Sequence, residues 1–410
     1  MNTFLLFILI VITGFLSFHF LIKKLQKKLL YFTGLEFLII GILVGEPFIR
    51  FLNHSLNTNF PIIFNQNASI QLKPIIALII GAVGFATGLQ FRIRNLAKIN
   101  FEHYRLALTD IFGTIIIISL IFFGLFYYFF SSVLTIEQMI VSSMVLGVSA
   151  STYSPTVLES LQHKFAIYGS NFNSLLSVSQ INNFFSILIF GLMFSIIHLG
   201  ETKGIKITST EWFVINVMIS IVIGFLFFIF LEREENENKM MLALFGIIIF
   251  SSGAAYYLNL SPLFMNLLIG MIIGNLFKLR DYISDIFKKL EHPFYVIILI
   301  YTGANINIDR WEYFLLGIII YLSFRILVKI FNGYLAYKTS YEKDIFSEKI
   351  GQGLNSQGIL AIVIALNFVQ VYSNPFSNLI LSIIVISVLI NEFLSTKMIK
   401  DLLINLNEIK

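Results

Sequence analysis

A few polar and charged residues interrupt the long apolar segments of this sequence, and these residues have the chemistry to hold or move a charge. Two adjacent amides, Asn182 and Asn183, lie at the centre of one apolar run. Asp110 lies in a second run, and Arg325 and Lys329 lie in a third. Membrane hydrocarbon disfavours such groups unless a partner pairs or hydrogen-bonds with them. We therefore treat them as candidates for an ion site inside a membrane.

Two other apolar segments carry residues that break helices. The first is GVSASTYSPTVLES, residues 147–160, and the second is GQGLNSQGILAI, residues 351–362. Proline removes a backbone hydrogen bond, and clustered Gly and Ser loosen a helix and leave carbonyl groups free. The residues expected at the two breaks are Pro155, Gly351, Gly353, Gln357 and Gly358.

The first of these segments also offers hydroxyl groups as cation ligands. They belong to Ser151, Thr152 and Ser154. The alternative is that these hydroxyls bond to preceding carbonyls within the helix. Both interpretations stay open from the sequence.

The composition is that of a membrane protein. Hydrophobic residues make up 57% of the 410 residues and charged residues only 12%, about half of what a soluble domain carries. The absence of cysteine excludes disulfides, thiolate metal sites and cysteine nucleophiles. No phosphate-binding glycine loop, zinc-binding spacing or nucleophile elbow is present, so no enzyme, metal or cofactor site is expected. The net charge of +5 lies in short loops and does not indicate nucleic-acid binding.

Thirteen apolar segments are long enough to span a membrane. They cover residues 2–22, 32–51, 72–90, 106–130, 138–160, 172–197, 212–230, 240–258, 261–277, 293–308, 312–336, 350–372 and 376–396. We predict an all-α polytopic protein of about 13 transmembrane helices. We expect a single membrane domain over residues 1–410, with no appended soluble domain.

The basic residues indicate how this domain lies in the membrane. If the N-terminus is outside, 21 of the 28 Lys and Arg residues fall in cytoplasmic segments, five fall in outer segments and two lie within a span. Cytoplasmic loops of membrane proteins carry an excess of Lys and Arg. The sequence therefore predicts a multi-pass cell-membrane protein, expected in a bacterial inner membrane, with its N-terminus outside and its C-terminus in the cytoplasm.

The two interrupted spans occupy matching positions along the chain. If span 212–230 is a linker helix, the remaining spans form two sets of six with opposite orientation, and the interrupted span is the fifth of each set. Paired broken helices in inverted repeats indicate a transporter binding site near the middle of the membrane. The alternative is that Pro and Gly are common in any membrane helix, but two breaks in matching places favour the transporter.

Several stretches resemble the monovalent cation:proton antiporter superfamily, in its branch of potassium-efflux and sodium/proton exchangers. SASTYSPTVLESL is similar to the family's LSSTSPTVVLPVL and is the most specific match. GLEFLIIGILVGEP, GAVGFATGLQFRIRNL, LFMNLLIGMIIGN and YTGANINID resemble other family stretches. The resemblance implies a homodimer in the bilayer. It also implies a dimer-side scaffold within residues 1–105 and 240–308, and a transport core within residues 106–197 and 312–396.

The sequence departs from this family at its acidic residues. The resemblance implies an Asp-Asp or Asn-Asp pair in the sixth span that binds the cation and the competing proton, but Asn182 and Asn183 occupy these positions. Gln90 replaces a family Glu, and the family's RGE reads Gln357, Gly358 and Ile359 here. An asparagine carbonyl can ligate Na⁺ or K⁺ but has no proton to give. We therefore expect ion binding without the family's usual proton coupling.

Arg325 and Lys329 are the cationic part of the candidate site, and they lie four residues apart on one helix face. The family has a basic residue in this span, which Lys329 matches best, with Arg325 as the second candidate. Asp110 lies about six residues, or roughly 9 Å, into its span from the cytoplasmic side, and Lys329 has a similar depth. We expect Asp110 to pair with Lys329 or Arg325. The alternative is that Asp110 lies capped or hydrated near the interface and that both cations snorkel.

These features predict a secondary active transporter that exchanges a monovalent cation for protons, with the coupling moved to Asp110 or Lys329. Two alternatives stay open. The same fold could carry an anion or a small organic acid, because the site has lost its acids and kept two cations. The chain could also be a non-transporting membrane sensor or assembly partner. Glu392, near the cytoplasmic end of the thirteenth span, is expected at the membrane interface.

Overall fold

The fold consists of helices. The computed structural model describes residues 10–14, 35–60, 62, 64, 66–165, 167, 169–196, 209–233, 236–277, 280–306, 311–342, 344–372 and 376–409. Within these residues the only β structure is two isolated bridges, Gly45 with Phe64 and Ile167 with Ile409. The all-α prediction is therefore confirmed.

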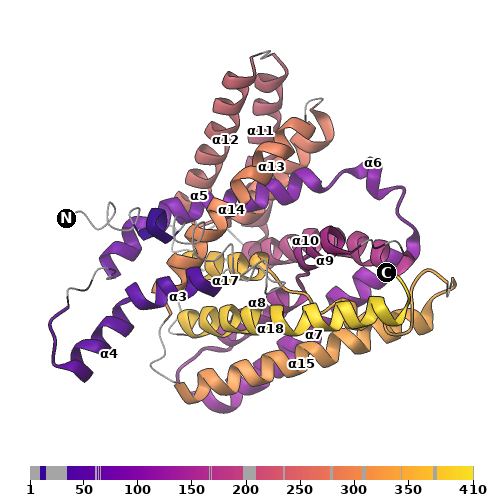
Figure 1. Ribbon diagram of the computed structural model, residues 1–410. Helices are drawn as coiled ribbons and strands as arrows, with labels where there is room; N and C mark the ends of the chain where they lie inside the picture. The colour runs from indigo at the N-terminus through magenta and orange to yellow at the C-terminus, as the bar shows by residue number, and fades with distance from the viewer. Residues whose placement is uncertain are drawn as a thin grey trace.

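Helices account for the second to thirteenth predicted spans, whereas most of the first span lies outside the described residues. The helices are α3 (Leu35–Val44), α4 (Glu46–Leu56), α5 (Gln66–Gln90), α6 (Ile93–Leu96), α7 (Phe101–Phe130), α8 (Ile136–Ser151), α9 (Thr156–Lys164), α10 (Ser170–Ile196), α11 (Ser209–Glu232), α12 (Glu237–Tyr257), α13 (Pro262–Leu276), α14 (Arg280–Ala304), α15 (Trp311–Thr339), α16 (Ile350–Gly353), α17 (Ile359–Val371) and α18 (Ser377–Asn405). Figure 1 shows their arrangement. In the described residues, seven helices are long and apolar enough to cross a membrane, and four shorter helices are also apolar.

The fifth and twelfth spans are broken, as the sequence predicts. α8 ends at Ser151, and α9 begins at Thr156 directly after Pro155. α16 ends at Gly353, and α17 begins at Ile359 after an extended Gly358. The two breaks touch, because the Ser154 amide donates a hydrogen bond to the Ser356 carbonyl over 3.3 Å.

Two other spans differ from the prediction. The second span is divided at Gly45, and Pro47 lies in the first turn of the helix that follows. The thirteenth span was expected to end at residue 396, but α18 continues to Asn405. The apolar pattern marks where hydrocarbon contact ends. A helix that satisfies its own backbone hydrogen bonds continues beyond that point.

Apart from the short α6, the described helices fall into two groups. The crossing group, α7–α10 and α15–α18, contains both breaks, and the flanking group is α3–α5 with α11–α14. Figure 1 shows the crossing group in the lower part of the view and α11 and α12 rising at the top. The two halves of the chain are the two predicted sets of six spans on either side of linker helix α11, and each helix of one half has a counterpart in the other. The counterpart of the packed pair α7–α8 is α15–α16. The counterpart of the pair α5–α13 is α14–α3. All four pairs are in contact, as inverted repeats require.

Glycines let two helices of the flanking group touch backbone to backbone. A Cβ atom added at Gly84 or Gly88 of α5 would lie 2.2 Å from a carbonyl oxygen of α13. One added at Gly270 of α13 would lie 2.3 Å from the Phe85 oxygen. Small residues at such contacts are the usual means of close packing between membrane helices. The α5–α13 pair is therefore intolerant of larger side chains.

We predict that Gly88→Val lowers the melting temperature of the purified protein, whereas Gly253→Val does not. Gly253 is the matched control, because a Cβ there meets nothing within 4 Å. Overpacking a close contact costs about 1–3 kcal/mol. The measurement is thermal unfolding in detergent, followed by size-exclusion chromatography. Equal melting temperatures for the two variants would contradict the backbone contact.

Candidate ion-binding site

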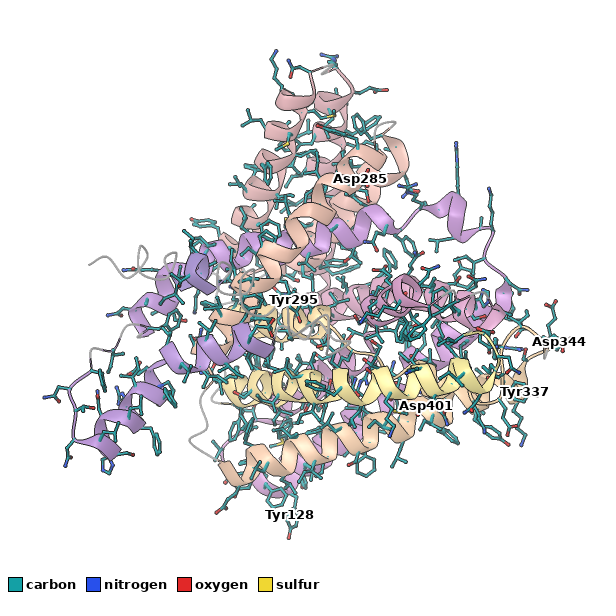
Figure 2. All side chains as sticks on the ribbon, in the orientation of Figure 1. Tyr128, Asp285, Tyr295, Tyr337, Asp344 and Asp401 are labelled. Atoms are coloured by element: carbon teal, nitrogen blue, oxygen red, sulfur yellow. The ribbon has the colours of Figure 1, made fainter. Side chains whose placement is uncertain are left out.

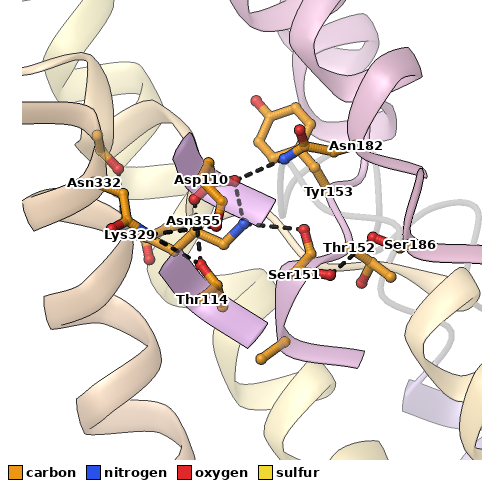
Figure 3. A network of polar contacts seen from close by, with 12 residues as sticks. Asp110, Thr114, Ser151, Thr152, Tyr153, Asn182, Ser186, Lys329, Asn332 and Asn355 are labelled. Atoms are coloured by element: carbon orange, nitrogen blue, oxygen red, sulfur yellow. Dashed lines mark hydrogen bonds and ion pairs between the residues drawn. The ribbon is translucent and has the colours of Figure 1, made fainter. Parts of the chain in front are cut away.

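Asp110 is the centre of the candidate site. It is buried on α7, and its Oδ2 accepts hydrogen bonds from Lys329 Nζ at 2.6 Å and from Asn182 Nδ2 at 2.7 Å. Its Oδ1 accepts a longer bond from Thr114 Oγ1 at 3.4 Å. These groups come from α7, α10 and α15, and Figure 3 shows them converging. The expected pairing of Asp110 with a cation of α15 is present, and that cation is Lys329.

Two polar residues that the sequence analysis did not single out, Thr114 and Asn332, support the pair of Asp110 and Lys329. Asn332 Nδ2 donates to the Asp110 carbonyl oxygen and to Thr114 Oγ1, both at 3.3 Å. Asn332 lies three residues after Lys329 and therefore on the same face of α15. That spacing was the signal that could have identified it. Lys329 Nζ also donates to the Ser151 carbonyl oxygen at 3.1 Å, which connects the pair to the first break.

Arg325 binds both breaks and not Asp110. Its Nε donates to the Ala150 oxygen at 3.0 Å and its Nη1 to the Asn355 oxygen at 2.7 Å. Its Nη2 donates to the Thr152 and Ser356 oxygens, each at 3.3 Å. Interrupted helices leave such carbonyls without intrahelical partners, and the guanidinium has several donors in a fixed plane. The alternative in which this buried cation snorkels is therefore wrong.

Asn183 lies on the other side of the first break, beside a cavity. Its Oδ1 accepts a hydrogen bond from the Tyr153 amide at 3.1 Å. The cavity has a volume of about 150 Å³ and lies between α5, α10, α14 and the two breaks. Its described lining includes no charged side chain. The polar lining residues are Thr87, Gln90, Tyr153, Ser154, Ser179, Gln180, Asn183 and Ser284.

The candidate hydroxyl ligands divide into two sets. Ser151 Oγ donates to the Val148 oxygen and Thr152 Oγ1 to the Ser149 oxygen, both at 2.8 Å. For these two residues the structure therefore shows the alternative in which the hydroxyl bonds to a preceding carbonyl of its own helix. Ser151 Oγ also shares a hydrogen bond with Ser186 Oγ. Ser154 lines the cavity. The first break therefore presents carbonyl oxygens to the two cations and a serine to the cavity.

The predicted residues of the second break pack against the first break and against neighbouring helices. Gln357 Nε2 donates to the Ser149 oxygen and the Tyr321 hydroxyl, both at 2.8 Å. Gly358 lies against Ser154, and Gly351 lies against the backbone of α15.

Gly353 faces Leu175 of α10, where an added Cβ would lie 2.6 Å from a methyl group. The structure thus places the predicted break residues at helix contacts around the site.

Several buried amide oxygens of the site have no hydrogen-bond partner in the described structure. They are Asn182 Oδ1, Asn355 Oδ1 and Gln357 Oε1. An unsatisfied buried oxygen is costly, and an ion or water is a common explanation. Asn182 Oδ1 is notable because the other end of the same amide binds Asp110. A carboxylate next to a free amide oxygen offers hard oxygen ligands of the kind that bind Na⁺ or K⁺.

Comparison with known families identifies the chain. Residues 18–397 match the family described as sodium/hydrogen exchanger, transmembrane. The chain belongs to the sodium/hydrogen exchanger family. The match covers nearly the whole length and confirms the superfamily that the motifs indicated. The family and its fold are those of a membrane transporter.

Solved structures show that this exchanger-family chain has an antiporter fold. Two structures of the sodium proton antiporter MjNhaP1 from Methanocaldococcus jannaschii are similar to it. The structure at pH 8 has a TM-score of 0.67 and 15% identity over 98% of both chains. The electron-microscopy structure has a TM-score of 0.60 and 15% identity over 95% of this chain and 93% of the other. At this identity the similarity establishes the fold. A search of curated proteins found no match.

We predict that Asp110→Asn destabilises the protein strongly and that adding Lys329→Met restores much of the loss. Removing one partner of a buried ion pair leaves an uncompensated charge, which costs about 3–5 kcal/mol. The measurement is the melting temperature in detergent, with Asp401→Asn, an exposed position on α18, as the control. An Asp110→Asn protein as stable as the control would show that the pair contributes nothing.

Proposed function

We propose that this chain is a secondary active transporter that exchanges a monovalent cation, Na⁺ or K⁺, for a proton, with Asp110 and Lys329 as the coupling pair. Membership of the sodium/hydrogen exchanger family supports the class of reaction. The observation that carries the proposal is the buried ion pair, in which Lys329 Nζ lies 2.6 Å from Asp110 Oδ2. Asn182, which replaces an acid of the family, is hydrogen-bonded to the same carboxylate.

The exchange is a competition for Asp110. In the proton-loaded form the Lys329 ammonium balances the carboxylate. An entering cation binds the Asp110 carboxylate and Asn182 Oδ1 and displaces the ammonium. A charged lysine without a counter-charge is unfavourable in hydrocarbon. Its N–H bond therefore breaks, the proton passes to water, and the neutral amine stays. One cation replaces one proton at this site.

The cavity supplies an approach to the breaks. Phe91, Leu96 and Ser284 line it, and these residues belong to segments that the charge pattern places on the cytoplasmic side. Asn183 and Ser154 lie where the cavity meets the breaks. The neutral lining offers oxygen atoms to a partly hydrated cation and no fixed charge that would hold it. This arrangement supports a state that is open toward the cytoplasm.

The geometry disfavours an anion as the substrate. Arg325 directs donors at four carbonyl oxygens, and Lys329 directs its ammonium at Asp110 and the Ser151 oxygen. Neither cation lines the cavity. An anion that entered it would meet amides and hydroxyls but no positive charge. The third possibility, a non-transporting relative, is tested by the experiment below.

The proposed function includes an arrangement in the membrane. The N-terminus lies outside and the C-terminus in the cytoplasm, and the chain forms a homodimer in a bacterial inner membrane. The flanking group, apart from linker helix α11, serves as the dimer-side scaffold, and the crossing group moves as the transport core. The asymmetry of basic residues supports the orientation, and the two sets of helix contacts support the division.

We expect wild-type proteoliposomes to show proton flux when Na⁺ or K⁺ is added outside. The flux is followed with an internal pH dye. Lys329→Met should reduce it to the level of protein-free liposomes, because the proton-carrying group is gone. Lys338→Met is the matched control, since Lys338 is an exposed lysine on the same helix.

A parallel Asn183→Asp variant distinguishes the other outcomes. If wild type shows no proton flux and Asn183→Asp does, the fold is that of an antiporter whose coupling is switched off. If neither protein shows proton flux, the proposed exchange is overturned. Wild-type flux that survives Lys329→Met would keep the exchange and remove Lys329 from it.

A further inference from the structure

The half-helices that follow the two breaks are related by the inverted repeat. α9 follows the first break, and α17 follows the second. The charge pattern of the loops predicts that α9 runs toward the cytoplasm and α17 toward the outside. Figure 1 shows them on opposite sides of the breaks. In Figure 2, Tyr128 lies toward the outer end of the crossing group, and Tyr337 and Asp344 lie at its cytoplasmic end.

These two half-helices have different neighbours. α17 packs against α5, α13 and α14 of the flanking group, whereas the main helix contact of α9 is with α18 of its own group. Where α9 begins, Ser154 and Pro155 line the cavity together with residues of α5. The two groups therefore touch beside α17 and are separated by the cavity beside α9. Inverted repeats alternate access by exchanging such surroundings between their two halves.

Two side-chain amides of α17 bind the flanking group. Asn367 Nδ2 donates a hydrogen bond to Ser261 Oγ at 2.7 Å, and Gln370 Nε2 donates to the Lys73 carbonyl oxygen at 3.2 Å. Ser261 is the N-cap of α13, and Lys73 lies in the first third of α5. The charge pattern of the loops predicts that both ends lie on the outer side. Three residues separate the two amides, so they lie on one face of α17.

Neither amide is fully hydrogen-bonded in this contact. Asn367 is fully buried, and in the described structure Asn367 Oδ1 and Gln370 Oε1 have no hydrogen-bond partner. A buried oxygen without a partner costs free energy that contact with water would return. Closing this contact therefore makes two hydrogen bonds and leaves two oxygens unsatisfied, and the entry of water reverses both. These opposing contributions make the contact easier to open than an apolar contact, which excludes water.

We propose that Asn367 and Gln370 form the outer gate of the transport pathway. The gate is closed in this structure, while the cavity provides access to the first break from the cytoplasmic side. In the opposite state α17 separates from α5 and α13, and water reaches both amides. The inference rests on the proposed function for what crosses the gate, and it adds the contact that opens and closes.

Thiol labelling tests this gate, because the chain contains no cysteine. Val363 is the reporter position, since it is fully buried and lies one helical turn before Asn367. Cells that express the Val363→Cys protein receive a membrane-impermeant maleimide from outside. Asn378→Cys, exposed at the outer end of α18, is the positive control. Lys338→Cys, exposed at the cytoplasmic end of α15, is the negative control.

Two substitutions of Asn367 should change the labelling of Val363→Cys in opposite directions. Asn367→Leu removes the unsatisfied oxygen and adds an apolar group that disfavours water, so it favours the closed gate. Asn367→Asp introduces an acid whose charge favours hydration, so it favours the open gate. Relative to Val363→Cys alone, labelling should be about fivefold slower with Asn367→Leu and about fivefold faster with Asn367→Asp. Equal rates in the three proteins would overturn the gate.

Gln370→Leu repeats the test at a partly buried position. It should slow the labelling of Val363→Cys as Asn367→Leu does, because it removes the second unsatisfied oxygen. Misfolding would speed labelling, so slower labelling identifies the gate even if Asn367→Asp is unstable. Melting temperatures in detergent show which variants are folded. A folded Gln370→Leu protein that labels as fast as its parent would remove Gln370 from the gate.

Proton flux in proteoliposomes separates this inference from the proposed function. Asn367→Leu should lower the cation-driven flux, because the site then reaches the outside less often. If both leucine variants slow labelling but wild type shows no flux, the gate is supported and the proposed exchange is overturned. If wild type shows flux and neither leucine variant changes labelling, the gate alone is overturned.

Discussion

The contact of Arg325 with the two breaks is the interaction on which the site depends. Two helices that stop inside a membrane leave carbonyl oxygens that lipid cannot satisfy. One guanidinium takes four of them, two from each half of the chain. This leaves Lys329 free to pair with Asp110, although both cations lie on one face of α15. The positive charge of Arg325 is matched by the oxygens of the breaks, so the carboxylate has a single cationic partner.

Sequence reasoning reached the breaks, the pairing of Asp110 with a cation of α15, and the family. These features have strong local signals, since Pro155 and the glycines near residue 353 break helices and charged residues are rare in apolar spans. The sequence could not decide whether Arg325 or Lys329 pairs with Asp110, because the two lie one helical turn apart on the same face. The carbonyl groups of the two breaks decide it, because they bind Arg325. Asn332 was undervalued because an amide on the same helix face as two charged residues looks ordinary in the sequence.

The two amides of the sixth span, Asn182 and Asn183, make hydrogen bonds at the site but carry no charge. Asn183 Oδ1 accepts a hydrogen bond from the Tyr153 amide, as a carboxylate could, whereas Asn182 Nδ2 donates to Asp110, which an ionised acid could not do. Asn183 holds the first break and Asn182 holds Asp110, and neither adds charge. The α5–α13 contact is similarly free of charge, because glycines there bring backbones together. The glycines and Asn183 therefore serve positioning, whereas Asp110, Lys329 and Asn182 carry the proposed ion chemistry.

The buried pair has a consequence for how such a protein draws energy. On the proposed mechanism, Asp110 is balanced either by the Lys329 ammonium or by a cation beside a neutral amine. Arg325 keeps its charge in both forms. The mobile part of the protein then has the same net charge whichever occupant it carries, so the membrane voltage performs no net work on a complete exchange. The direction of exchange follows from the chemical gradients of the two ions alone, and a polarised and a depolarised cell would run it equally well.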